Sequence, residues 1–294
     1  MHCEEASLVL YAALGSEPTA SGELSLPYFL LGAPLTQSLT NRASEAFCWA
    51  TLVYAQVNSG QVLGSIRSGR RALTLSQESK NVWAQIYSTI GLTHGLLEVG
   101  AYEEALLLTQ PALALVRTLP QSIILQRFLF GLGRTYHALQ QWDEARRTLD
   151  ETLVVAERLD LGRLYVPTLS QLCMHFAVAG EWEAAYQYAL KAISLRKRTG
   201  AALVALDFSP QYETEALLRG EEERQARAEV QRLGERLGSN RRFRIPYLRS
   251  LAVLSTWEGQ REQATGHLLE AARLAADLGL PGEHWQIQVE VGRL

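Results

Sequence analysis

Polar turns interrupt the apolar stretches of this chain at a nearly constant interval. Four successive steps between the turns span 40 residues each, and the last step spans 39. The turns begin at Gly60, Gly100, Gln140, Gly180, Gly220 and Gly259. A fixed period in the range of twenty to fifty residues predicts a solenoid in which each unit packs only on its neighbours.

Each unit has the pattern of a helix, a tight turn and a second helix. In the second unit the pattern predicts a first helix from about Val82 to Val99 and a second from about Tyr102 to Leu119. Gly100 occupies the place where helices favour a left-handed residue after their last turn. The acidic residues that follow fall in the first turn of the next helix, where the helix dipole favours negative charge.

Small residues recur at two fixed offsets after the turns, and these allow helix axes to approach closely. They are Ala105, Ala145, Ala185 and Ala264 at the first offset, and Ala72, Ala112, Ala192 and Ala271 at the second. The bulky residues expected to pack against them are Leu92, Leu96, Leu132, Tyr136, Leu172, Phe176 and Leu251. Core packing is the expected role of all of these residues.

The sequence therefore predicts an all-α fold, a right-handed α-solenoid of about six helix-turn-helix repeats. Residues 1–42 do not follow the period and are expected to form an irregular N-terminal cap. Residues 43–278 form the predicted array, with units at about 43–80, 81–120, 121–161, 162–200, 201–240 and 241–278. Residues 279–294 are either a C-terminal capping helix, which we favour, or the start of a further unit.

Unit five departs from the pattern of the others. Ser209 and Pro210 read as a helix N-cap followed by proline at the first helical position, so its first helix is expected to be short or kinked. Its second helix, Glu221 to Arg236, is densely charged and is expected to be a solvated face or a joint or docking surface. Three arginines follow and would either pair with the acids of that helix or bind an anion; they are Arg241, Arg242 and Arg244.

The turns carry a resemblance to a known superfamily. The residues that carry it are Gly133, Tyr136, Trp142 and Ala145, and then Gly180, Trp182, Ala185 and Ala192. They resemble the tetratricopeptide (TPR) pattern of Gly, Tyr, aromatic and Ala, whose usual period is about 34 residues. The longer period is similar to the superhelix of the maltose-activator type, found in bacterial signal-transducing ATPases and LuxR-type activators. It also resembles the repeats of bacterial peptide-pheromone receptors.

Composition and charge argue against several classes of function and location. The net charge of −3 gives no global attraction to nucleic acid or to anionic lipid. The three cysteines form no CxxC pair, which fits a reducing compartment. No signal peptide or apolar stretch long enough to span a membrane is evident. We expect a cytoplasmic protein that binds neither nucleic acid nor membranes directly.

The sequence contains no recognisable catalytic constellation. No P-loop, GxSxG or HExxH motif is present, and the histidines are scattered along the chain. A metal site built on His94 and His137 would need a third ligand, for which Glu98 is the candidate. We therefore expect no enzyme activity, no cofactor and no metal.

The TPR resemblance implies that the first helix of each unit lines the concave side of the solenoid. The residues expected to face this groove are Phe47, Tyr54, Tyr87, His94, Arg127, Phe130, Arg134, His137, Met174 and Arg249. Aromatic residues and arginine dominate binding hot spots, and the guanidinium group suits carboxylates and phosphates. The hypothesis is that the groove binds an acidic peptide segment or a small polar ligand. Alternatively, the arginines are solvated or paired with Glu98 or Glu213.

Two functions follow from these features. The first is a non-catalytic scaffold that binds a protein or peptide, as the partner-binding region of a bacterial signalling or transcription-regulatory system. The second is a domain that senses a sugar or metabolite, as the maltose-activator resemblance implies. An open channel along the concave side would favour the first, and a closed pocket between units would favour the second.

Overall fold

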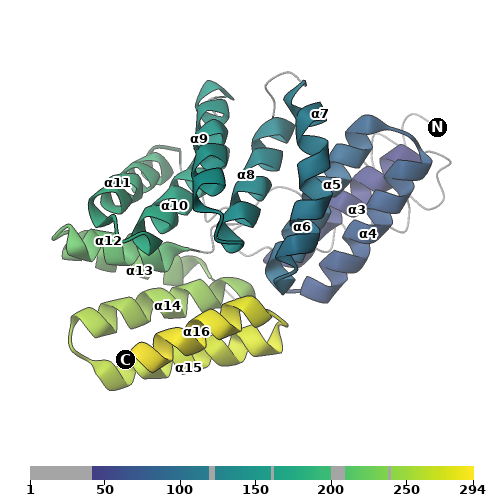
Figure 1. The fold of residues 1–294 in the computed structure, drawn as a ribbon. Coiled ribbons are helices and arrows are strands. Elements are labelled where there is room, and N and C mark those ends of the chain that lie inside the picture. The colour runs from purple at the N-terminus through teal and green to yellow at the C-terminus, as the bar shows by residue number, and fades with distance from the viewer. Residues whose placement is uncertain (1–41, 119–122, 160–161, 200–208, 238–239) are drawn as a thin grey trace.

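A computed structural model describes residues 42–118, 123–159, 162–199, 209–237 and 240–294 (Figure 1). Within these ranges every regular element is a helix, as the period predicts. The expected N-terminal cap falls, apart from Arg42, outside the described residues. The division of the chain into cap, array and capping helix stays a prediction.

The described helices alternate between first and second helices of successive units. The first helices are α3 (Arg42–Asn58), α5 (Val82–Val99), α8 (Ile123–Ala138), α10 (Gly162–Val178), α12 (Pro210–Arg219) and α14 (Arg241–Trp257). The second helices are α4 (Val62–Glu78), α6 (Tyr102–Thr109) with α7 (Leu113–Arg117), α9 (Trp142–Leu159), α11 (Trp182–Thr199), α13 (Glu223–Arg236) and α15 (Arg261–Asp277). A last helix, α16 (Pro281–Arg293), packs against α15.

The predicted left-handed turns are confirmed in most units. Gly60, Gly100, Gly180 and Gly259 have φ angles between 76° and 79°. At Gly100, the next residue, Ala101, donates its backbone N–H to the Leu96 carbonyl at 3.0 Å. This pairing satisfies carbonyl groups that the helix end would otherwise leave open, and glycine adopts the required φ without a steric penalty.

Two elements differ from the prediction. In unit five the left-handed residue is Glu221, with φ of 62°, while Gly220 has φ of −85°. In unit two the second helix was predicted to be continuous, but a 3-10 segment, η1 (Gln110–Ala112), separates α6 from α7. Pro111 explains the break, because proline lacks the backbone N–H and its ring clashes with the preceding helical turn.

The small residues form the expected joints between helices. Ala105, Ala145, Ala185 and Ala264 have no exposed surface. At the second offset Ala72, Ala192 and Ala271 are equally buried, while Ala112 is partly buried beside the break at η1. The close approach of helices that the sequence indicated is therefore confirmed for these joints.

The last helices of the chain return to the first ones. Figure 1 shows α14, α15 and α16 running along one side of the preceding helices and reaching back toward α5 and α6. Val53 and Val57 of α3 share a buried apolar cluster with Leu233, Leu237 and Phe243 from the α13–α14 region. We call the contacts of α3–α5 with α13–α16 the closing seam.

Polar groups also cross the closing seam. The Asn240 side-chain amide donates to the Asn58 carbonyl at 2.9 Å. Gly60 lies so close to Leu278 that a Cβ atom there would come within 2.9 Å of the leucine side chain. The forty-residue period relates each unit to its neighbours and does not predict contacts between the first units and the last.

Candidate functional site

The residues predicted to face the groove come from consecutive first helices, and the forty-residue period places them at matching positions. Tyr54, His94, Arg134 and Met174 are spaced forty residues apart along α3, α5, α8 and α10. Phe47, Tyr87 and Arg127 form a second row with the same spacing. We refer to the side of the solenoid formed by these two rows as the inner face.

An aromatic–arginine cluster occupies the inner face between α3, α5 and α8. The rings of Phe47 and Tyr87 stack with centroids 4.2 Å apart. Arg127 donates from Nη1 to the Tyr87 hydroxyl at 3.2 Å, and its guanidinium carbon lies 5.3 Å from the Tyr54 ring centroid. The Tyr54 ring in turn lies 5.0 Å from the His94 ring. Cation–π contact and the hydrogen bond hold Arg127 in one orientation.

His94 is the most enclosed member of this group. Its side chain has no exposed surface, and neither ring nitrogen has a hydrogen-bond partner among the described residues. The Tyr54 hydroxyl is buried and likewise without such a partner there. Burial, together with repulsion from Arg134 and Arg127, holds the pKa of His94 well below its ordinary value. The ring is therefore neutral in the folded protein.

His137 lies further along the inner face beside other aromatic side chains. Its ring centroid is 5.0 Å from that of Trp142 and 5.7 Å from that of His175. Burial, with smaller effects from His175 and Arg134, lowers the pKa of His137 to about 3. Both His94 and His137 thus stay uncharged while the protein is folded near neutral pH.

These histidines make the stability depend on pH. Each binds a proton in the unfolded chain below its ordinary pKa of about 6.5 but not in the folded protein. The contribution of each neutral histidine to the free energy of unfolding is complete above that pH. It is lost as the pH falls, by about 1.4 kcal/mol per pH unit for each proton bound by the unfolded chain. We expect His94→Phe to reduce this slope in urea titrations between pH 6.5 and pH 4. Equal slopes in His94→Phe and in the unmodified protein would contradict the assignment.

A buried chain of ion pairs crosses from the inner face into the closing seam. Arg134 Nη2 lies 3.5 Å from Glu98, which also accepts from Arg242 Nε at 2.9 Å. Arg242 pairs with Glu283 at 2.9 Å, and Glu283 lies 3.6 Å from Arg249. The alternative in which Arg134 pairs with Glu98 is thus confirmed, and both carboxylates are shared between two arginines.

The arginines after unit five pair with acids, but not with those of α13. Arg241 pairs with Asp277 at 2.8 Å and Arg244 with Glu270 at 2.8 Å, both on α15. Arg242 forms ion pairs with Glu98 of α5 and Glu283 of α16. The predicted pairing partner was wrong, because the return of α14 toward the first units brings other carboxylates within reach.

Several residues predicted to line an open groove are buried in the structure. The exposed fractions are 8% for Tyr54, 0% for His94, 3% for Phe130 and 3% for Arg249. Phe130 packs in a core cluster with Leu149 and Leu172, and Arg249 is enclosed by its carboxylate partners. Burial follows from helix packing and from the closing seam, neither of which a projection onto one helix face includes.

Only some of the residues predicted to face the groove keep exposed surface that a ligand could contact. They are Phe47 on α3, and Arg127, Arg134, His137 and Met174 on α8 and α10. Tyr87 is buried but holds Arg127 through its hydroxyl. A role of these residues in ligand binding stays a prediction.

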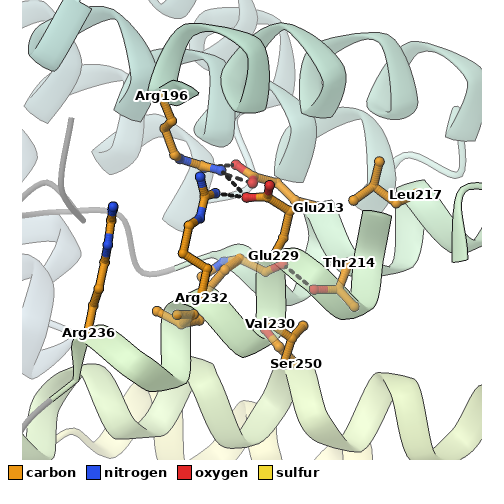
Figure 2. Close-up of a pocket in the computed structure, with 11 residues that line it drawn as sticks. Arg196, Glu213, Thr214, Leu217, Glu229, Val230, Arg232, Arg236 and Ser250 are labelled. Carbon is orange, nitrogen blue, oxygen red and sulfur yellow. Dashed lines mark hydrogen bonds and ion pairs between the residues drawn. The ribbon is translucent and has the colours of Figure 1, made fainter. Parts of the chain in front are cut away.

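The structure also contains a pocket that the sequence did not indicate. It lies between α11, α12, α13 and α14 and is lined by charged and aliphatic side chains (Figure 2). Its cavity volume is about 30 Å³, within about 470 Å³ of space that is partly open to solvent. The charged residues are Arg196, Arg232, Arg236, Glu213 and Glu229. Glu229, Arg232 and Arg236 follow one another on α13 at helical spacing, which is the signal that could have placed them on one face.

The described part of the chain gives little support for metal binding or for a reactive thiol. No group of three or more His, Cys, Asp or Glu residues there could hold a metal ion. Burial, with a smaller effect from Glu45, raises the pKa of the Cys48 thiol to about 11, so it is protonated at neutral pH. None of the described helices is long and apolar enough to cross a membrane.

Comparison with known proteins identifies the fold. No protein-family model and no curated protein matches the chain. Its structure is similar to that of a Rap protein complexed with Competence and Sporulation Factor, with a TM-score of 0.58 and 15% identity over 92% of this chain and 71% of that one. It is also similar to the apo form of RapI, with a TM-score of 0.53 and 16% identity over 98% of each chain.

A third similar structure is aspartyl phosphate phosphatase F from Bacillus subtilis. The TM-score is 0.60 and the identity 14%, over 87% of this chain and 66% of that one. The chain has the TPR-like helical repeat fold of these proteins. None of the three carries a maltose-activator or LuxR-type name, so that finer resemblance gains no support from them.

Proposed function

We propose that this chain is a non-catalytic protein-interaction scaffold of a bacterial regulatory system. In this proposal the inner face around α8 binds an acidic segment of a partner protein. A helical repeat array offers a long surface for such contacts. One of the similar structures is a Rap protein complexed with Competence and Sporulation Factor, so a solenoid of this fold can hold a partner.

The observation that supports the proposal most directly is the burial of Arg127 without an ion-pair partner among the described residues. Its side chain is largely enclosed yet partly reaches the surface, and no carboxylate forms an ion pair with it among the described residues. A guanidinium group withdrawn from water ordinarily requires an anionic partner. The neighbouring tyrosines orient Arg127 but supply no negative charge at neutral pH. A carboxylate from a partner would complete this site.

Arg134 and Met174 extend the same surface toward α10. Arg134 already shares Glu98 with Arg242, so it adds less free charge than Arg127. Met174 offers a flexible apolar side chain that adapts to different partners. A bound segment would therefore combine one acidic residue at Arg127 with an apolar residue near Met174.

The test is selection of short random peptides displayed on phage, using the full chain as bait. We expect an excess of Asp and Glu in the selected peptides, and at least about tenfold weaker binding by Arg127→Gln in fluorescence anisotropy. Arg146→Gln is the control, because Arg146 also lies over an aromatic ring, Phe176, but is paired with Asp150. Selected peptides without acidic residues, or equal binding by both variants, would exclude the proposed mode.

A further inference from the structure

Two carboxylates, those of Glu213 and Glu229, line the pocket between α11, α12, α13 and α14, and they differ in how closely they are bonded to their neighbours. Glu213 is buried and accepts from Arg196 Nη2 at 2.5 and 2.7 Å and from the Ser170 hydroxyl. Arg196 also donates to Ser170 at 3.1 Å. These three residues form a compact, well-bonded group that joins α10, α11 and α12.

Glu229 has a looser arrangement on the α13 side of the pocket. Its carboxylate lies 3.9 Å from Arg196 Nη1 and 3.9 Å from Lys197 Nζ, and it pairs with Arg232 on its own helix. One carboxylate thus faces three cations, and two of its contacts are too long to be hydrogen bonds. The side chain keeps 13% of its surface exposed, so it can turn toward solvent.

Figure 2 shows the elements from which the cations of the pocket come. Arg196 reaches in from α11, Arg232 rises from α13 beside Glu229, and Arg236 extends along the same side one helical turn further on. Planar guanidinium groups in this arrangement match the two oxygens of a carboxylate. The pocket is therefore suited to an anionic group of carboxylate geometry.

The remaining walls determine what is attached to that anion. Leu217, Val230 and Leu233 provide an aliphatic surface. The hydroxyls of Thr214 and Ser250, which also line the pocket, already donate to backbone carbonyls of their own helices at 3.0 and 2.9 Å. These walls favour an aliphatic group attached to the anion.

We propose that this pocket binds a carboxylate carried on a short branched aliphatic group, and that Glu229 occupies the anion position when no ligand is bound. The incoming carboxylate takes over the contacts of Glu229 to Arg196 and Arg232, which line the pocket, while the Glu229 side chain turns out to solvent. Two sources share this chemistry, a free aliphatic acid and the C-terminal residue of a peptide. The pocket shares no residue with the inner-face site, so the two proposals can fail independently.

The experiment uses the full chain and three probes, with affinities from isothermal titration calorimetry. They are isocaproate, which has the carbon skeleton of leucine without its amino group, acetyl-Gly-Leu with a free carboxylate, and the corresponding C-terminal amide. We expect binding of one or both acids and none of the amide. Isocaproate alone identifies a free acid as the source, and the peptide acid alone identifies a peptide end. Absence of binding by both acids, or equal binding of the amide, would overturn the proposal.

Variants test the exchange with Glu229 directly. We expect Glu229→Gln to bind the acids about tenfold more tightly, because the internal competitor loses its charge, and Arg232→Met to bind them at least about tenfold more weakly. Arg227→Met is the control on the same helix, since Arg227 pairs with Glu223 and Glu258 outside the pocket. Circular dichroism checks that each variant is folded. If Arg232→Met does not fold, the affinity of Glu229→Gln for the acids still tests the proposal. An affinity equal to or weaker than that of the unmodified protein would contradict the replacement of Glu229 by the ligand.

Discussion

Arg242→Met is expected to lower the free energy of unfolding by about 3 kcal/mol, the lower end of the cost of breaking a buried ion pair. Arg242 is 3% exposed and links Glu98 of α5 to Glu283 of α16. Methionine keeps much of the aliphatic volume but leaves the buried Glu98 and the partly buried Glu283 with one cation fewer. Because Arg134 and Arg249 still face these carboxylates, we expect the lower end of the range.

The control for this substitution is the preceding residue. Arg241→Met removes an ion pair with Asp277 in which both side chains are about half exposed. Exposed pairs of this kind contribute roughly 0–1 kcal/mol. Urea denaturation followed by circular dichroism compares the two variants, and equal midpoints would show that the closing seam does not depend on Arg242.

Hydrogen exchange locates the effect of Arg242→Met within the array. In a repeat protein each unit ordinarily depends on its immediate neighbours alone. The closing seam adds contacts between α3–α5 and α13–α16, so loss of Arg242 should raise exchange at both ends of the array. Increased exchange restricted to α14 and α15 would instead indicate a local defect.

The sequence predicts the fold well because the signals of a helical repeat are local. The glycines at the turns and the acids after them act within about one turn of helix, and the buried alanines act between adjacent helices. Their positions were therefore sufficient to place most helices. Two local deviations, the break at Pro111 and the left-handed Glu221, also have local causes, but they run against the repeated pattern.

The candidate site was predictable only in part. The forty-residue period correctly relates Tyr54, His94 and Arg134, because residues at matching positions of neighbouring helices lie side by side. It does not predict how deeply they are buried, since that depends on the curvature of the whole array and on the closing seam. The pocket was missed for a similar reason, because its residues come from four helices.

Glycines at matching positions of two first helices should respond oppositely to the same substitution. Gly91 of α5 and Gly131 of α8 are forty residues apart. A Cβ atom at Gly91 would lie 2.9 Å from the backbone carbonyl oxygen of Ala50, which cannot move without shifting α3. At Gly131 the nearest atom would be a methyl carbon of Thr93 at 3.6 Å, an ordinary contact distance.

Gly91→Ala is therefore expected to destabilise the protein by about 1–3 kcal/mol, as overpacking of a close helix contact does. Gly131→Ala should stabilise it by roughly 0.5–1 kcal/mol, because alanine favours the helix and restricts the unfolded chain. Thermal and urea midpoints of both variants test the pair against each other. The opposite signs matter more than either magnitude, because composition and helical position are the same at both sites and only the distance to the neighbouring helix differs. Destabilisation of similar size at both positions would mean that α5 does not approach α3 more closely than α8 approaches α5.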